Sequence, residues 1–189
     1  MADPRSLLID LPPWAAAREQ DNRRYAGDED RMRVAIELAA ANVMHGTGGP
    51  FGAAIFDGHG QLVAIGVNSV VRLRNSALHA EMVAFMRAQA RIGDYSLAAA
   101  GNPPHSLYSS CDPCAMCLGA ALWAGVKRIV CGATRQDASG LQFDEGPVFP
   151  ESYAYLRRRG IEVVHAVLRD EARATLEQYR VRGGVIYNA

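Results

Sequence analysis

Apolar positions along the chain switch between helical spacing and short continuous runs. Three- and four-residue intervals predict helices over residues 30–44, 78–92, 113–123, 153–159 and 170–182. Short apolar runs between turn-forming residues predict strands over 51–56, 62–67, 106–110, 127–131 and 161–164. The turn at Asp57-Gly-His-Gly60 makes the first two strands a hairpin.

The order of these elements predicts the fold class. Strands that alternate with helices form a layered α/β domain in which crossover helices connect parallel strands. We therefore expect a three-layer α/β/α domain at residues 28–189, with a mixed sheet of about five strands. The first 27 residues show no sustained period, so we expect an N-terminal surface arm with at most a short helix.

Composition narrows the class of protein. Of the 189 residues 49% are hydrophobic, and 20 basic side chains balance 20 acidic ones. This excludes a disordered or collagen-like chain and removes the electrostatic signature of a nucleic-acid binder. The longest uncharged stretch in the first half, residues 38–56, contains glycines and a proline that argue against a membrane span. The apolar stretch after Met1-Ala-Asp-Pro-Arg5 is broken by Asp10, Pro12 and Pro13, so we expect no signal peptide and a cytoplasmic protein.

Three of the four cysteines are crowded into Cys111-Asp-Pro-Cys114-Ala-Met-Cys117. Cys114 and Cys117 are three residues apart, which on a helix places both sulfurs on one face and suits a tetrahedral ion. His79, at the start of another predicted helix, is a candidate third ligand. Two thiolates and one imidazole would neutralise Zn²⁺ and leave the fourth position to a water molecule, as in catalytic zinc sites.

Glu81 follows His79 by two residues and is the natural general base beside such a metal. His79-Ala-Glu81 and Pro113-Cys-Ala-Met-Cys117 together match the signature of zinc-dependent base deaminases. Two other interpretations stay open at this point. Cys111 and Cys114 have the spacing of a redox pair, and a zinc site without a base would indicate a binding module. Cys111 itself is expected to be a small buried residue near the site.

From about residue 31 to 164 the chain resembles the cytidine-deaminase-like superfamily. Within it, the stretch from Leu107 to Trp123 is similar to bacterial guanine deaminases, with Asp112 in place of the usual Glu and Ala115 in place of the usual Pro. The resemblance implies a zinc-dependent hydrolytic deamination of guanine to xanthine and ammonia. It also implies a homodimer whose C-terminal segments are exchanged.

The resemblance further assigns roles to five residues outside the metal motif. It implies that Phe51 faces the purine, that the amide of Asn68 binds it, and that Trp123 lines the pocket. Glu145, after a Phe-Asp pair, would orient guanine and pass a proton to the departing ammonia. Tyr187 would reach into the neighbouring subunit's pocket as a lid. From the residues alone, Phe51 and Trp123 suit the core, Asn68 a turn and Glu145 a solvated loop.

Related activities share the zinc motif. A tRNA adenosine deaminase needs a phosphate-binding surface, which zero net charge argues against. Deamination of cytosine, cytidine or a small amino-heterocycle such as an aminotriazine is a further alternative.

Overall fold

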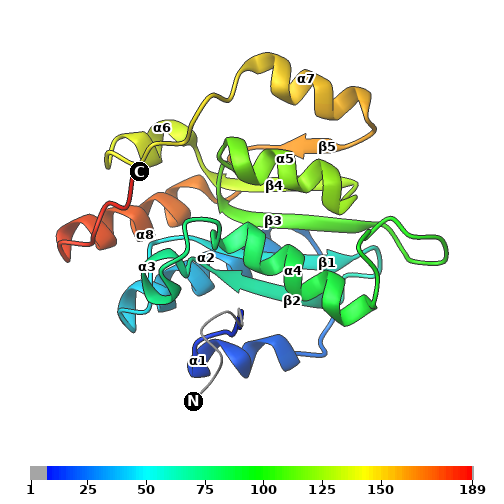
Figure 1. Ribbon diagram of the computed structural model, residues 1–189, viewed down its shortest axis with the longest axis horizontal. Coiled ribbons are helices and arrows are strands. Elements are labelled where there is room, and N and C mark those ends of the chain that lie inside the picture. Colours follow the sequence, from blue (N-terminus) through cyan, green and yellow to red (C-terminus); the bar gives the residue numbers. More distant parts are fainter. Residues whose placement is uncertain (1–7, 189) are drawn as a thin grey trace.

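A mixed five-stranded sheet organises the molecule (Figure 1). This computed structural model describes residues 8–188. The strands are β1 (Gly52–Asp57), β2 (Leu62–Val67), β3 (His105–Cys111), β4 (Arg128–Ala133) and β5 (Glu162–Val164). They lie in the order β2-β1-β3-β4-β5, with β1 antiparallel to β2 and β3 and with β3, β4 and β5 parallel.

Helices cover both faces of this sheet. The longer ones are α2 (Asp28–Met44), α4 (Ala80–Ile92), α5 (Ala115–Ala124), α7 (Pro150–Arg158) and α8 (Arg169–Val181). The short ones are α1 (Pro13–Ala16), η1 (Arg18–Gln20), α3 (Val70–Leu73) and α6 (Arg135–Ser139). In Figure 1, α4 and α5 lie in front of the sheet and α2 behind it, and each face has its own buried apolar core. The predicted α/β fold with about five strands is thus confirmed.

Two details of the helices differ from the prediction. Helices α3 and α6 have four and five residues, too few to produce a recognisable apolar period. Helix α5 starts at Ala115 and not at Pro113, because Cys114 is extended (ψ 174°) and occupies the N-cap position. Both cysteines of the metal motif remain in the first turn or at its edge.

The N-terminal arm is part of the domain and not a loose appendage. It contains the expected short helix, α1, but Leu11, Ala15 and Tyr25 are buried in the core on the α2 side. Arg24 also forms an isolated β-bridge with Gln61. The first residues of the arm, including the segment from Met1 to Arg5, lie outside the described residues.

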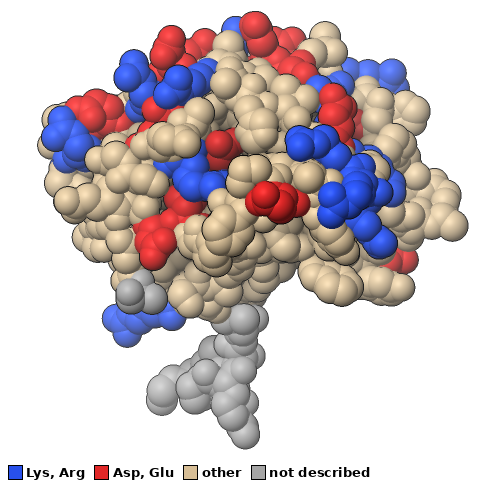
Figure 2. Space-filling model, turned by 90° about the horizontal axis from the view of Figure 1, so that it is seen from above, with Lys and Arg blue, Asp and Glu red and all other residues tan. Residues whose placement is uncertain are grey.

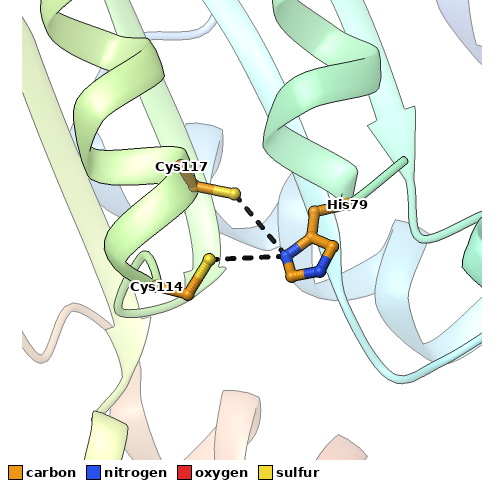
Figure 3. A group of neighbouring side chains, drawn as sticks. All are labelled: His79, Cys114 and Cys117. Carbon is orange, nitrogen blue, oxygen red and sulfur yellow. Dashed lines mark hydrogen bonds between the residues drawn. The ribbon is translucent and has the colours of Figure 1, made fainter. Parts of the chain in front are cut away.

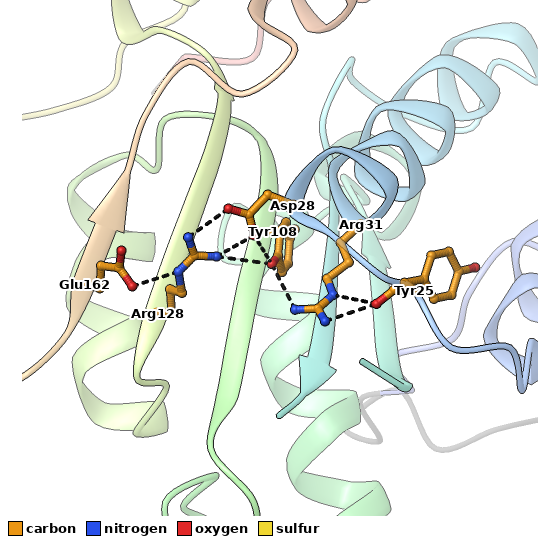
Figure 4. A network of polar contacts seen from close by, with 6 residues as sticks. All are labelled: Tyr25, Asp28, Arg31, Tyr108, Arg128 and Glu162. Atoms are coloured by element: carbon orange, nitrogen blue, oxygen red, sulfur yellow. Dashed lines mark hydrogen bonds and ion pairs between the residues drawn. The ribbon is translucent and has the colours of Figure 1, made fainter. Parts of the chain in front are cut away.

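A polar network fixes the end of the sheet opposite to the carboxyl ends of β3 and β4 (Figure 4). Arg128 donates to both carboxylate oxygens of Asp28, at 2.6 and 2.8 Å, and to Glu162 at 2.8 Å. The buried Tyr108 hydroxyl donates to Asp28 at 2.7 Å. The network therefore joins the first turn of α2 to β3, β4 and β5.

The described surface carries both signs of charge. Figure 2 shows basic and acidic side chains scattered over a largely uncharged face. None of the helices within residues 8–188 combines the length and apolar character needed to cross a bilayer.

Candidate metal centre and pocket

Three potential metal ligands converge where α4 and α5 begin (Figure 3). His79 is the N-cap residue of α4, Cys114 is the N-cap residue of α5, and Cys117 lies in the first turn of α5. The Sγ atoms of Cys114 and Cys117 are 3.5 and 3.7 Å from Nδ1 of His79. The predicted His/Cys/Cys triad is therefore assembled by two helix starts.

These distances fit zinc. Zinc binds nitrogen at about 2.0 Å and sulfur at about 2.3 Å, so a tetrahedral site separates a nitrogen from a sulfur ligand by about 3.6 Å. The two separations in the structure, 3.5 and 3.7 Å, lie on either side of that value. A soft-donor set of one imidazole and two thiolates also suits zinc, and three protein ligands leave one position for water.

Neighbouring groups change the pKa values of the two cysteine thiols. A hydrogen bond from Cys117, opposed by burial and supported by His79, lowers the pKa of Cys114 to about 4. The Cys114 bond and burial raise the pKa of Cys117 well above its usual value. A bound cation would displace the protons that these ligands still hold, because metal ligands bind in their deprotonated form.

A cavity of about 490 Å³ opens beside these ligands. Its walls include Glu81, which is only 6% exposed and accepts a hydrogen bond from the Ser109 hydroxyl at 3.2 Å. Burial and the nearby Cys114 raise the pKa of Glu81. A carboxylate whose pKa is raised in this way is suited to exchange protons with a water molecule or a substrate.

Glu145 lines the same cavity from the loop before α7. Its carbonyl accepts a hydrogen bond from the Ala115 amide at 3.0 Å, which attaches the loop to the start of α5. Burial, Cys114 and Glu81 raise the pKa of Glu145 to about 8. The structure therefore brings the second predicted carboxylate into the pocket and not onto a solvated loop.

Aromatic rings form another part of the cavity wall. Phe51 and Tyr187 both pack on Phe143, with ring centroids 5.0 and 5.2 Å apart. Asn68, only 1% exposed, lies at the end of β2 and also lines the cavity. The pocket thus pairs an apolar surface for a flat ring with an amide that can both donate and accept.

Tyr187 lies in the pocket of its own chain, with its hydroxyl so close to Gly49 that a Cβ there would be 2.2 Å away. The exchange of this segment between subunits, which the resemblance implies, stays a prediction. The Tyr187 hydroxyl is buried without a hydrogen-bond partner among the described residues.

Trp123 is not among the residues that line this cavity in the single chain, so its role in a pocket stays a prediction. It lies in the last turn of α5 and is 81% exposed. The first turn of α5 holds the metal ligands, and residues near its last turn are too far along the helix to reach the same cavity. Cys111, in contrast, is buried at the end of β3 as expected.

Two pocket residues carried no recognised signal of their own in the sequence. Phe143 is the phenylalanine of the Phe-Asp pair before Glu145, and it is buried. Asn188 belongs to no motif. It accepts from the Asp144 amide at 3.0 Å and donates to the Gln142 carbonyl at 2.6 Å, so the chain end holds the Glu145 loop.

A second group of potential ligands consists of Asp112, Cys131 and His165, and of these only Asp112 lines the cavity. The Asp112 carboxylate is already engaged by Nδ1 of His165 at 2.8 Å and by the Arg135 amide at 3.2 Å. These hydrogen bonds connect the end of β3 to the loops that follow β4 and β5, and we interpret the group as structural.

Comparisons with known proteins agree with this geometry. Residues 26–133 match the family model for the cytidine and deoxycytidylate deaminase zinc-binding region. The chain is 37% identical to guanine deaminase of Bacillus subtilis over 123 residues, covering 65% of this chain and 75% of that protein. It is 30% identical to a tRNA-specific adenosine deaminase of Haemophilus influenzae, covering 80% and 82% of the two chains. The solved structure of guanine deaminase from Nitrosomonas europaea is 41% identical, with a TM-score of 0.90 and coverage of 93% and 97%.

Proposed function

The chain belongs to the cytidine and deoxycytidylate deaminase zinc-binding family, and on this premise we propose that it hydrolyses guanine to xanthine and ammonia. The observation that carries the substrate is the presence of two carboxylates, Glu81 and Glu145, in one pocket beside the metal ligands. Guanine carries N–H donors at N1 and at the amino group on C2, so its recognition calls for an acceptor in addition to the carboxylate that moves the proton. Glu145 supplies this acceptor.

Zinc held by His79, Cys114 and Cys117 would supply the acidity that turns a water molecule into a nucleophile at neutral pH. Glu81 takes a proton from the attacking water as the C2–O bond forms and delivers it to N3 of the purine. Glu145, ionised when guanine binds, accepts the second water proton from the new C2 hydroxyl and delivers it to the amino group. The C2–N bond then breaks, ammonia leaves, and the C2–O bond becomes the carbonyl of xanthine. One water molecule is consumed, and both carboxylates end ionised, as they began.

Binding of the base would depend on the other residues of the cavity wall. The Asn68 amide can donate to one purine edge atom and accept from another. Phe51 offers its ring to the flat base, and Tyr187 presents a hydroxyl that has no protein partner among the described residues. Because residues 187–188 line the cavity, an RNA strand would have to displace them, and this favours a free base over the tRNA substrate of the Haemophilus relative.

A homodimer is part of the proposal, with the outer face of α5 as its contact. Met116, Gly119, Ala120 and Trp123 lie on one side of this helix, and Trp123 is 81% exposed. A helix that is apolar on all sides is normally buried, so a second subunit would cover this face. Ala120→Glu should convert a dimer into a monomer in sedimentation, and an unchanged dimer would place the contact elsewhere.

We also expect the reaction to take place in the cytoplasm. Four free cysteines, two of them metal ligands, need a reducing compartment to escape disulfide formation.

A substrate panel tests the proposal. The zinc-loaded protein is incubated with guanine, cytosine, ammeline as an aminotriazine, and a tRNA anticodon stem-loop carrying adenosine, and ammonia is measured. We expect guanine to be deaminated fastest by at least 100-fold. Faster turnover of the stem-loop or of cytosine would refute the substrate assignment and retain the family.

A further inference from the structure

The buried amide of Asn42 joins the two backbone segments that carry the base-binding residues. Asn42 is fully buried on α2, away from the metal ligands. Its Nδ2 donates to the carbonyl of Gly49 at 2.9 Å and to the carbonyl of Asn68 at 3.0 Å. One side chain thereby fixes the turn that leads into Phe51 and the end of β2 that presents Asn68.

The backbone around this amide is tightly packed, and its polar groups are hydrogen-bonded. The Asn68 amide donates to the Phe51 carbonyl at 3.1 Å, so both backbone groups of Asn68 are engaged. At Gly48 a Cβ would lie 2.0 Å from the Asn68 carbonyl and 2.7 Å from Nδ2 of Asn42. The turn passes so close that only glycine fits, and a small movement of the Asn42 amide would shift both segments.

The orientation of this amide is set by Thr47 and Trp14. Indole Nε1–H can only donate, and it points at Oγ1 of Thr47 from 3.1 Å. The Thr47 hydroxyl must then use its own hydrogen elsewhere, and Oδ1 of Asn42 is 2.6 Å away. With Oδ1 held as the acceptor, the two hydrogens of Nδ2 face the two carbonyls.

Trp14 belongs to α1 in the N-terminal arm, which the proposed mechanism does not use. Its ring stacks on His45 just after α2, with centroids 5.2 Å apart, and the neighbouring Ala15 is fully buried. The indole is therefore held in place by packing as well as by its hydrogen bond.

We propose that the arm is a positioning element for the base-binding end of the pocket, acting through Trp14, Thr47 and Asn42. Trp14 directs the Thr47 hydroxyl, Thr47 directs the Asn42 amide, and that amide fixes the carbonyl groups beside Phe51 and Asn68. None of the three residues lines the pocket. The inference rests on the proposed function, because it identifies this end of the pocket as the part that binds guanine.

The test measures guanine binding without turnover. In a zinc-loaded Glu81→Gln background, Thr47→Val keeps the shape of the side chain and removes the hydroxyl, and Thr47→Ser keeps the hydroxyl. Thr175→Val, at a buried position on α8, is the matched control for loss of a threonine hydroxyl in the core. Calorimetry gives the Kd for guanine in each.

We expect Thr47→Val to raise Kd about 10-fold, the effect of losing one well-placed hydrogen bond, with one zinc per chain retained. Thr47→Ser and Thr175→Val should stay within about twofold of the parent. With Glu81 restored, KM should rise and kcat should change little. An unchanged Kd in Thr47→Val, or an equal loss in Thr175→Val, would overturn the inference, since a purely structural role would lower only thermal stability.

Two further measurements test the inference if Thr47→Val does not fold or if the parent protein does not bind guanine. If Thr47→Val fails to fold, Trp14→Phe removes the first donor alone and should raise Kd about threefold; no change would again overturn the inference. If guanine does not bind even the Glu81→Gln parent, the proposed function fails instead. Hydrogen exchange over residues 47–51 and 66–69 then tests the positioning alone: faster exchange in Thr47→Val supports it, and unchanged exchange refutes it.

Discussion

Replacement of Glu145 by Gln tests the division of labour between the two carboxylates. The side chains have nearly the same shape, and the loop is anchored through the backbone bond between Ala115 and Glu145, so the fold and the metal site should survive. What changes is the chemistry. The Gln amide has one acceptor oxygen where the carboxylate has two, and the amide cannot take up and release a proton at neutral pH.

The size of the effect follows from this loss. A hydrogen bond to a charged group contributes about 1.5–3 kcal/mol, and the loss of general acid catalysis costs about 100-fold or more. We expect kcat/KM for guanine to fall about 100-fold, which corresponds to about 2.7 kcal/mol of transition-state stabilisation. Glu151→Gln, the same change at an exposed position on α7, is the control and should stay within about twofold.

The pH profile adds a second test. Glu145 must be ionised to accept hydrogen bonds from guanine, so activity should rise with pH through its pKa. Burial and the Cys114 thiolate set that pKa at about 8, and zinc, by neutralising the thiolate, should move the rising limb below pH 8. The assay is steady-state ammonia release from pH 5 to 9. Near-normal turnover by the Glu145→Gln variant would refute the assignment. A rising limb at the same pH in the variant as in the wild type would refute it as well.

Three further outcomes follow from the same structure. Tyr187→Phe removes a hydroxyl that lacks a partner among the described residues, so KM for guanine should rise about fivefold with little change in melting temperature; an unchanged KM would exclude a contact with the substrate. Asp28→Asn should lower the free energy of urea unfolding by about 1 kcal/mol at pH 7, because Arg128 holds the pKa of this partly exposed carboxyl below its usual 3.8. That stabilisation is present above pH 4 and is lost as the pH falls through the lowered pKa, so wild type and variant should converge in acid; a constant difference would contradict this origin. Cys114→Ala should abolish zinc binding by metal analysis together with activity, and a zinc-loaded active variant would contradict the ligand assignment.

The sequence predicted those parts of the site that depend on local spacing. His79 and Glu81 lie two residues apart at one helix start, and Cys114 and Cys117 lie three apart at another, so their relative positions depend on little besides helix geometry. The alternation of strands and helices similarly sufficed for the fold, because chain connectivity restricts how such elements can pack.

The remainder depended on contacts between distant segments. Nothing local indicates that Trp123 faces outward at the far end of α5, or that Tyr187 folds back into the pocket of its own chain. The bond from Trp14 to Thr47 joins residues 33 apart and the bond from Thr47 to Asn42 joins residues five apart, and neither follows a motif, so the connection becomes visible only when the arm is seen packed on α2.

The most direct test of the central claim is a paired measurement of zinc content and ammonia release with guanine, for the wild type and for Glu81→Gln. We expect about one zinc per chain in both proteins, rapid formation of xanthine and ammonia by the wild type, and a loss of at least 1000-fold in the variant. A zinc-loaded wild type that releases no ammonia from guanine, or a Glu81→Gln variant that releases it at the same rate, would contradict the account.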